Sequence, residues 1–211
     1  AALGRQGPAG PALFGSGAEG LFRVHRARVE LDLDAGDEAL SSAVDRISVD
    51  EQITDVVVFS ARDAARMLHA LGRVHERLLA IPHVTAMRVR SRALAVEPST
   101  FSEGAISRIG SFNRIRVTRP LRVEVELTVL HPSDLTADLG RVVRGLRRRG
   151  VTVYANLPLL MHLNDDETDL LDFTSRCRRL GIEVHHLVLS GHPLQQDWAA
   201  VHPVPVGRVV D

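Results

Sequence analysis

Six strand-like segments follow one another along this chain, with helix-like segments between them. Residues 23–34 (RVHRARVELDLD) alternate apolar and polar side chains, as a strand does, and Leu40, Val44 and Ile47 follow at helical spacing. A parallel sheet requires each helix to return the chain to the same end of the sheet. The alternation therefore predicts parallel strands joined by helices. The predicted strands are 23–34, 53–60, 83–91, 121–130, 151–160 and 182–190.

The predicted helices lie between these strands and carry start and stop signals. They cover residues 37–48, 63–81, a weaker stretch near 100–109, and the segments that end before Gly150 and Gly181. Glycine commonly ends a helix because it adopts a left-handed backbone at little cost. Asn164, three residues before Glu167, has the spacing of a capping box and is predicted to begin the last helix.

The number of units and the composition bound the fold class. Six strand–helix units are too few for a closed eight-stranded barrel and suit an open, partial (β/α)6 barrel of the α/β class. The 211 residues are 45% hydrophobic, which is enough for one core. We therefore predict one barrel domain at 21–211. Residues 1–20, rich in Gly, Ala and Pro, are predicted to be a flexible N-terminal arm.

Charge and cysteine content exclude several classes of partner. The 26 basic and 26 acidic residues cancel, so no overall field attracts nucleic acid or an anionic membrane. Cys177 is the single cysteine and cannot form an internal disulfide. No apolar run reaches the roughly 18 residues of a membrane span, and residues 1–20 lack the pattern of a secretory signal. These features predict a cytoplasmic protein that binds neither nucleic acid nor membrane.

Ligands of open parallel sheets and barrels meet the loops after the carboxyl ends of the strands. Those loops begin here at residues 60–63, 90–93, 130–134, 160–165 and 190–198. His185 and His186, adjacent on one predicted strand, are expected to point to opposite faces. No HxxxH or CxxC pair is present, so no metal site is predicted. The histidines that could still converge at the loop ends are His131, His162, His186 and His192.

Several segments together resemble a known family. They are ITDVVVFSARDA, IPHVTAMRVRSRALAVEPS, LHPSDLT, GVTVYANLPLLMHLNDD and HPVPVG, in that order along residues 18–210. The chain resembles lysine 2,3-aminomutase and its relatives among the radical S-adenosylmethionine enzymes. The resemblance implies a partial (β/α)6 barrel of the radical S-adenosylmethionine type. In that family a CxxxCxxC motif binds a [4Fe–4S] cluster, S-adenosylmethionine yields a radical, and an amino group moves on a pyridoxal phosphate-bound amino acid.

The residues that carry this chemistry in the family are replaced here. By register, the three cluster cysteines would fall at Ala18, Phe22 and His25, and none of these is a thiolate. The family's SGG(D/E) turn stands as Ser60 followed by Ala61, Arg62 and Asp63, which add side chains where glycine permits close approach. The matching stretches contain no lysine, and the segment that carries the family's pyridoxal phosphate lysine would follow Asp211. We therefore expect none of the three cofactors.

Two polar positions still match substrate-binding residues of the family, and a third is changed. Arg92 matches the arginine that pairs with the substrate carboxylate, and Asp165 matches one of the two aspartates that hold its distal amino group. The second aspartate is replaced by His192, which would not attract an ammonium group in the same way. Structural roles remain open beside these. Arg92 can pair with a neighbouring acid, Asp165 can cap a helix, and Asp63 can start one.

Two functions from different classes follow. The first is a non-catalytic pseudoenzyme that acts as a partner or scaffold subunit, as a homo-oligomer or with a catalytic relative, and that keeps a pocket for a small amino-acid-like ligand. The second is an enzyme acting on an amino acid or a derivative of one, including a split aminomutase completed by another chain.

Overall fold

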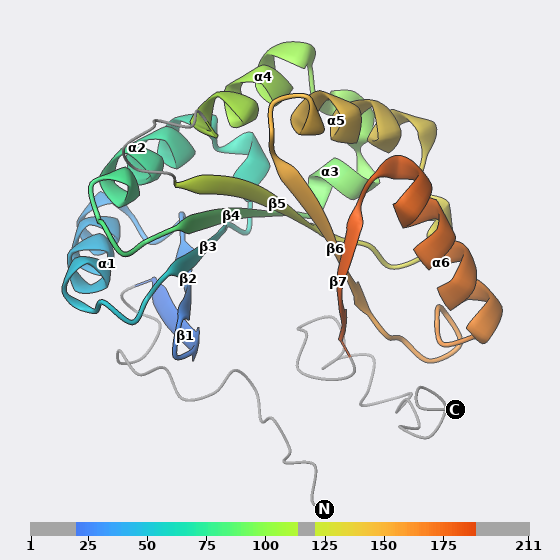
Figure 1. The fold of residues 1–211 in the computed structure, drawn as a ribbon, viewed down its shortest axis with the longest axis horizontal. Helices are drawn as coiled ribbons and strands as arrows, with labels where there is room; N and C mark the ends of the chain where they lie inside the picture. Colours follow the sequence, from blue (N-terminus) through green and yellow to red (C-terminus); the bar gives the residue numbers. More distant parts are fainter. Residues whose placement is uncertain (1–19, 114–120, 189–211) are drawn as a thin grey trace, which may run out of the picture.

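The fold is a single curled sheet covered by helices. The computed structural model describes residues 20–113 and 121–188, and these form one seven-stranded sheet in the order β1 to β7 (Figure 1). β1 is antiparallel to β2, and every later neighbouring pair is parallel. The predicted α/β class is confirmed, and the half-barrel curl is compatible with a partial barrel. The strands are β1 Leu21–His25, β2 Arg28–Asp32, β3 Asp55–Phe59, β4 Ala86–Ser91, β5 Arg122–Thr128, β6 Thr152–Pro158 and β7 Glu183–Val188.

The first predicted strand is two strands. The sequence predicts one strand at 23–34, but β1 and β2 form a hairpin in which Phe22 pairs with Glu30. The chain reverses between the strands, where the Ala27 N–H donates to His25 Nδ1 at 3.2 Å. Alternation of apolar and polar residues continues with the same period on both sides of a tight turn, so the pattern did not reveal the reversal. β2 is the first of the six parallel strands.

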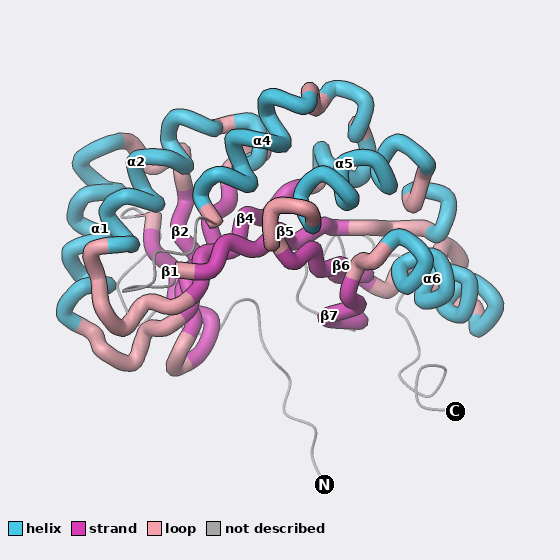
Figure 2. The backbone as a smooth tube through the Cα atoms, turned by 45° about the horizontal axis from the view of Figure 1, so that its top comes forward, coloured by secondary structure: helices cyan, strands magenta, loops and turns pink. Residues whose placement is uncertain are grey.

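The helices lie on the convex side of the sheet. Figures 1 and 2 show α1, α2, α4, α5 and α6 on that side, with the concave side facing away from them. A right-handed crossover from each strand to its parallel neighbour accounts for this one-sided arrangement. The helices are α1 Asp37–Val49, α2 Leu68–Leu79, α3 Ala93–Val96, α4 Glu103–Phe112, α5 Ala137–Arg147 and α6 Glu167–Leu180.

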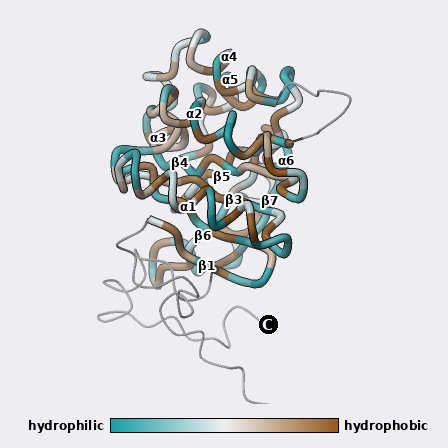
Figure 3. Tube along the Cα trace, turned by 90° about the vertical axis from the view of Figure 1, so that its left-hand side faces the viewer, coloured by the Kyte–Doolittle hydropathy of each residue, from teal (hydrophilic) through white to brown (hydrophobic). Residues whose placement is uncertain are grey.

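The hydrophobic core fills the space between the helices and the convex face. Every second strand residue contributes to it, for example Val56 and Val58 on β3 and Val123 and Val125 on β5. Figure 3 shows hydrophobic stretches of the trace running through the middle of the molecule. The alternate strand residues point to the concave face, where many are charged. Because successive side chains of a strand point to opposite faces, the residues between the core positions together form a polar surface on the concave face.

The helix boundaries correct two predictions. The helix predicted at 63–81 divides at Met67 into a short 3₁₀ turn and α2. The N-cap of α6 is Asp166, whose side chain accepts from the Thr168 N–H, and not Asn164 as predicted. Gly181 ends α6 with φ 76°, which confirms the predicted stop.

No helix within residues 20–113 and 121–188 combines the length and the apolar content needed to cross a membrane. The predicted arm at 1–20 lies outside the described residues except for Gly20.

Candidate functional site

Asp63 joins the carboxyl ends of β3 and β4. Its Oδ1 accepts from the Ala65 N–H at 3.1 Å and from Ser91 Oγ at 2.8 Å, and its Oδ2 accepts from the N–H groups of Arg92 and Ala93 at 2.8 and 2.7 Å. Its φ of 73° is unusual for a residue other than glycine, and the four hydrogen bonds hold this backbone in place. The predicted helix start at Asp63 is confirmed. The Asp63 carboxylate thus accepts four hydrogen bonds from groups of the same chain.

The turn before Asp63 is also satisfied internally. The Asp34 carboxylate accepts from Ser60 Oγ at 2.7 Å, from the Ala61 N–H at 2.8 Å and from Arg62 Nε at 2.9 Å. The Ser60 hydrogen bond is the main reason that the pKa of Asp34 lies below its ordinary value, and Arg62 and Ala61 add to it. The donors of Ser60, Ala61 and Arg62 are therefore bonded to Asp34 and are not directed at a ligand.

Arg92 differs from its neighbours. It precedes α3 at the carboxyl end of β4 and is exposed. Its guanidinium makes no hydrogen bond or ion pair with any residue in 20–113 or 121–188, so the predicted pairing with a neighbouring acid is not seen there. Five N–H donors in a planar fork face solvent at the end of the sheet where ligands of such folds bind.

Asp165 lies in the loop between β6 and α6. It is buried, and its Oδ1 accepts from the His162 N–H at 2.8 Å. α6 begins at Glu167, and its N-cap is Asp166 rather than Asp165. The prediction that Asp165 caps the helix is therefore wrong, and its carboxylate turns back to order the loop.

Asn164 fastens the same loop to its neighbour. Its Oδ1 accepts from the Leu160 N–H at 2.7 Å, while its Nδ2 donates to the carbonyl groups of Leu130 and Pro158 at 2.6 and 2.9 Å. These bonds join the ends of β5 and β6 and explain why Asn164 is buried rather than placed at a helix terminus.

Of the three positions that match the family's cluster cysteines, the two that the structure describes, Phe22 and His25, lie on β1. Phe22 lies on β1 and its ring is 6.0 Å from that of Phe59 on β3. His25 is exposed at the end of β1, which runs antiparallel and so ends beside the start of β2. Ala18 and His192 lie outside the described residues.

Cys177, the single cysteine of the chain, is buried in α6 on the convex side. Burial raises its pKa to about 12, so the thiol stays protonated. A cluster of the family type needs three thiolates. The donor set of these residues does not fit it.

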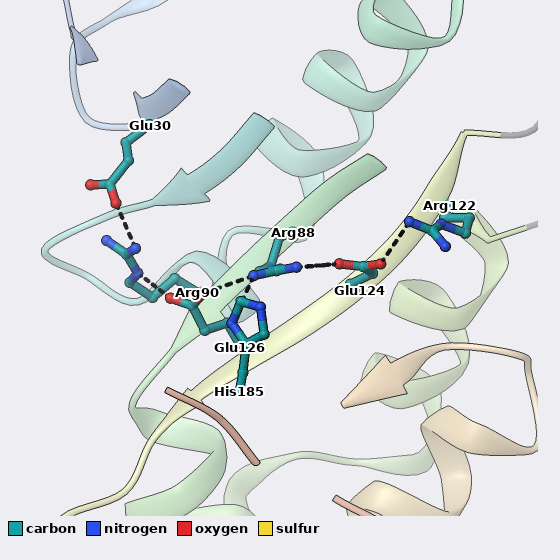
Figure 4. A network of polar contacts seen from close by, with 7 residues as sticks. All are labelled: Glu30, Arg88, Arg90, Arg122, Glu124, Glu126 and His185. Carbon is teal, nitrogen blue, oxygen red and sulfur yellow. Dashed lines mark hydrogen bonds and ion pairs between the residues drawn. The ribbon is translucent and has the colours of Figure 1, made fainter. Parts of the chain in front are cut away.

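The concave face carries a ladder of alternating charge (Figure 4). On neighbouring strands, Arg88 faces Glu124 and Arg90 faces Glu126. Arg88 Nη2 lies 2.8 Å from Glu124 Oε2, and Arg90 Nε lies 2.7 Å from Glu126 Oε1. Three further ion pairs complete the ladder. Arg88 Nη1 lies 3.4 Å from Glu126 Oε2, Arg122 Nη2 lies 3.4 Å from Glu124 Oε1, and Arg90 Nη2 lies 2.6 Å from Glu30 Oε1.

Burial and pairing have opposite effects on the pKa values of two ladder residues, Glu126 and Arg90. Burial alone would raise the pKa of Glu126, but Arg90, Arg88 and a hydrogen bond from Asn156 outweigh it and hold the pKa below its ordinary value. Burial would likewise lower the pKa of Arg90, and its bonds to Glu30 and Glu126 reverse that effect. Glu126 and Arg90 therefore stay charged and paired, and both β5 carboxylates, Glu124 and Glu126, are bound by arginine side chains.

The two adjacent histidines of β7 lie on the same face, which corrects the sequence-based prediction. Ala155 pairs with Val184 and Asn156 pairs with His186, so His185 is an extra residue in β7. Such a bulge breaks the alternation of faces. The rings of His185 and His186 are 3.8 Å apart, and His185 Nδ1 lies 3.3 Å from Arg88 Nη1.

The surroundings of these histidines keep both neutral. Burial is the largest cause of the low pKa of His185, about 4, and the positive charge of Arg88 is the next. Burial and Arg28 lower the pKa of His186 in the same direction. At pH 7 the concave face therefore presents two uncharged imidazoles beside a neutralised charge ladder.

The convergence of histidines that the sequence left open is not observed in the described part of the chain. His131 caps the short turn after β5 and lies 3.9 Å from Asp169. Within residues 20–113 and 121–188, no three His, Cys, Asp or Glu side chains are grouped so as to hold a metal ion. His192, the remaining candidate, lies outside those ranges.

Sequence reasoning missed the ladder, although a signal was present. The segments MRVRS and LRVEVELT alternate apolar residues with positive charges in one strand and negative charges in the next. On neighbouring parallel strands such residues lie opposite one another on one face. Their pairing follows once the strands are known to be neighbours.

Comparisons with known proteins show a distant likeness. No family model matches the chain. A protein of Aquifex aeolicus (strain VF5) named "Putative L-lysine 2,3-aminomutase" is 25% identical over 150 residues, which cover 71% of this chain and 39% of that protein. The chain thus spans well under half the length of this curated relative, and it is similar to an aminomutase over most of its own length.

Proposed function

We propose that this chain is an aminomutase-like half barrel that serves as a non-catalytic partner or scaffold subunit, with a catalytic relative as the partner. The likeness to the Aquifex protein supports the aminomutase relationship. The observation that carries the non-catalytic role is the state of Cys177, a buried thiol on the convex side with a raised pKa, in a chain without any other cysteine.

The turn at residues 60–63 supports the same proposal. Asp34 occupies the donors of Ser60, Ala61 and Arg62, and Asp63 is occupied by four donors. A turn whose hydrogen bonds close on its own chain has little left to offer a cofactor. On the concave face, the β5 carboxylates Glu124 and Glu126 are likewise bound by Arg88 and Arg90.

The test measures two properties of the protein: its iron content and its association with an aminomutase. The protein is purified anaerobically, alone and co-expressed with a cysteine-bearing aminomutase, and iron, sulfide and complex mass are measured. We expect no iron in the isolated chain and a stable complex whose iron matches the aminomutase alone. Stoichiometric iron and sulfide in the isolated chain, or two proteins that never co-elute, would overturn the proposal.

Arg92 favours a second candidate function, the recognition of an amino acid. At the carboxyl end of β4, its guanidinium has no hydrogen-bond or ion-pair partner among the residues that the structure describes, and a substrate carboxylate would be bound there in an aminomutase-like enzyme. In a split aminomutase this chain would then contribute substrate binding and the other chain the cofactors. Binding of lysine and related amino acids is measured by calorimetry for the wild type, for Arg92→Gln and for the exposed control Arg178→Gln. Binding that only Arg92→Gln abolishes supports this function, and unchanged binding contradicts it.

A further inference from the structure

β7 forms an open edge of the sheet. Among the described residues it pairs with β6 alone, and Figure 1 shows β7 and α6 at one end of the sheet with no further helix or strand drawn beyond them. Natural sheets commonly protect such an edge with lysine, other charges or proline. β7 has the sequence EVHHLV, in which Glu183 is the single acidic residue and lysine, arginine and proline are absent. Its outer side is therefore suited to pairing with another strand.

Exposed apolar side chains gather at the same edge. Six large hydrophobic side chains are exposed in the described ranges, and three of them, Leu171 of α6 and Val184 and Leu187 of β7, lie on two elements that pack on each other. The other three lie singly on β1, α1 and α3. Single exposed apolar residues are ordinary, whereas a group of them indicates a contact surface.

The two β7 residues of this group extend the core to the edge. Val184 and Leu187 are in register with Ala155 and Leu157 of β6, whose side chains are fully buried in the core. Neighbours in register point to the same face of a sheet, so Val184 and Leu187 point to the convex side, where α6 lies. They are 39% and 43% exposed, because no described element covers the convex side beyond β7.

α6 presents an exposed stripe toward this edge. Glu167, Leu171, Thr174 and Arg178 are all exposed, and spacings of four, three and four residues place them on one side of the helix. Asp169, two residues from both Glu167 and Leu171, lies on the opposite side and is 3.9 Å from the His131 ring in the turn before α5. The stripe therefore faces away from the neighbouring α5 unit.

The charges of this stripe are unpaired within the described ranges. On the rest of α6, Arg176 and Asp172 lie 2.8 Å apart and form an ion pair. Glu167 and Arg178 make no ion pair with any residue in 20–113 or 121–188. One end of the stripe is thus negative and the other end positive, with an apolar residue between them.

This order makes the stripe complementary to a second copy of itself. Glu167 lies four residues before Leu171, and Arg178 lies four residues after Thr174. When two such helices lie antiparallel, Glu167 of each copy faces Arg178 of the other, and Leu171 faces Thr174. A two-fold axis creates each of these contacts twice. The same axis makes the two β7 strands antiparallel, which is the arrangement in which two identical edges can pair.

We propose that two copies of this chain form a two-fold symmetric dimer by joining their β7 edges, with their α6 helices side by side on the convex side. Val184 and Leu187 of one copy then pack near Leu187 and Val184 of the other, and the α6 ion pairs flank this apolar centre. The dimer leaves Arg92 and the charge ladder uncovered. It does not rest on the proposed function, because it needs no aminomutase.

The experiment measures the mass of the 211-residue protein alone by sedimentation at several concentrations. We expect a dimer that dissociates on dilution. Leu187→Lys is expected to weaken association by at least about tenfold, because a charge replaces an apolar group at the centre of the contact. Val96→Lys, which changes an exposed valine of α3, is the matched control and is expected to associate as the wild type does. Circular dichroism checks that each variant is folded.

A charge exchange identifies the helix contact. Glu167→Arg and Arg178→Glu each place like charges opposite one another at both symmetric positions, and each is expected to weaken association by about tenfold. An equimolar mixture of the two variants should associate again, because every contact between the two different copies then joins opposite charges. Arg148→Glu, which changes an exposed arginine at the end of α5, is the control and should leave the dimer intact.

Three results would overturn the dimer. The first is a monomer at every concentration, which is also the outcome if residues 189–211 of the same chain occupy the edge. The second is association that Leu187→Lys leaves unchanged. The third is a mixture of Glu167→Arg and Arg178→Glu that associates no better than either variant alone, and this result decides if Leu187→Lys does not fold. A complex with an aminomutase from a chain that is monomeric alone would support the proposed function and still overturn the dimer.

Discussion

Arg88 donates two hydrogen bonds to Glu124 Oε2, from Nε at 3.1 Å and from Nη2 at 2.8 Å, and both side chains are buried on the concave face. The same guanidinium lies 4.7 Å from the ring of Tyr154. This contact sits at the centre of the ladder and connects β4, β5 and β6. The interior side of the half barrel is therefore held by paired charges and a cation–π contact, in addition to the apolar core on the other side.

Breaking the ladder at its centre is expected to be costly. Arg88→Met leaves Glu124 buried without its main partner, and we expect a loss of about 3 to 5 kcal/mol in the free energy of unfolding. Urea denaturation measures it. The control Arg122→Met removes an exposed partner of the same glutamate and should cost at most about 1 kcal/mol. Arg88→Met combined with Glu124→Met should be milder than Arg88→Met alone, and equal losses in all three variants would contradict the assignment.

Asp63 is expected to be the main clamp of the loop ends. Asp63→Ala removes four hydrogen bonds that hold Ser91, Arg92 and the turn after β3, so we expect about 2 to 3 kcal/mol of destabilisation. Hydrogen exchange at the Arg92 and Ala93 amides should accelerate in the variant. Asp138→Ala, an exposed first-turn residue of α5, should change stability by about 0.5 kcal/mol. Unchanged exchange at Arg92 and Ala93 would contradict the clamp.

The neutral His185 predicts a dependence of stability on pH. Its pKa is about 4 in the folded protein and 6.5 ordinarily, so the unfolded chain binds this proton more readily. The free energy of unfolding should therefore fall as the pH is lowered from about 6.5 towards about 4, and it should recover when the pH is raised again. Urea denaturation across this range measures the slope. His185→Gln and His185→Phe should both flatten it, and a slope that stays as steep in both variants would rule out His185 as a source.

Cys177 is expected to be inert in the native state. Burial raises its pKa to about 12, and thiolates are the reactive species. Ellman's reagent should label it rapidly in urea and very slowly in buffer. Ser99→Cys, which adds an exposed thiol on the 3₁₀ turn after α3, should react rapidly in buffer and serves as the control. Rapid native labelling of the wild-type chain would show that the α6 face opens.

The sequence by itself determined the sheet and its helices. All six parallel strands lie inside the predicted ranges, because apolar residues must alternate with period 2 to pack one face of a strand. Gly181 was identified as a helix end for an equally local reason, since its left-handed backbone favours glycine. These features depend on neighbours along the chain.

Only the tertiary structure decided how distant residues meet. The hairpin of β1 and β2 keeps the same alternation on both sides of its turn, and the bulge that brings His185 beside His186 depends on the register of β7 against β6. The residues of the charge ladder meet because the strands that carry them are ordered β1 to β7 in one sheet. Strand order and curvature arise from contacts between residues far apart in sequence, and periodicity within a segment carries no information about them.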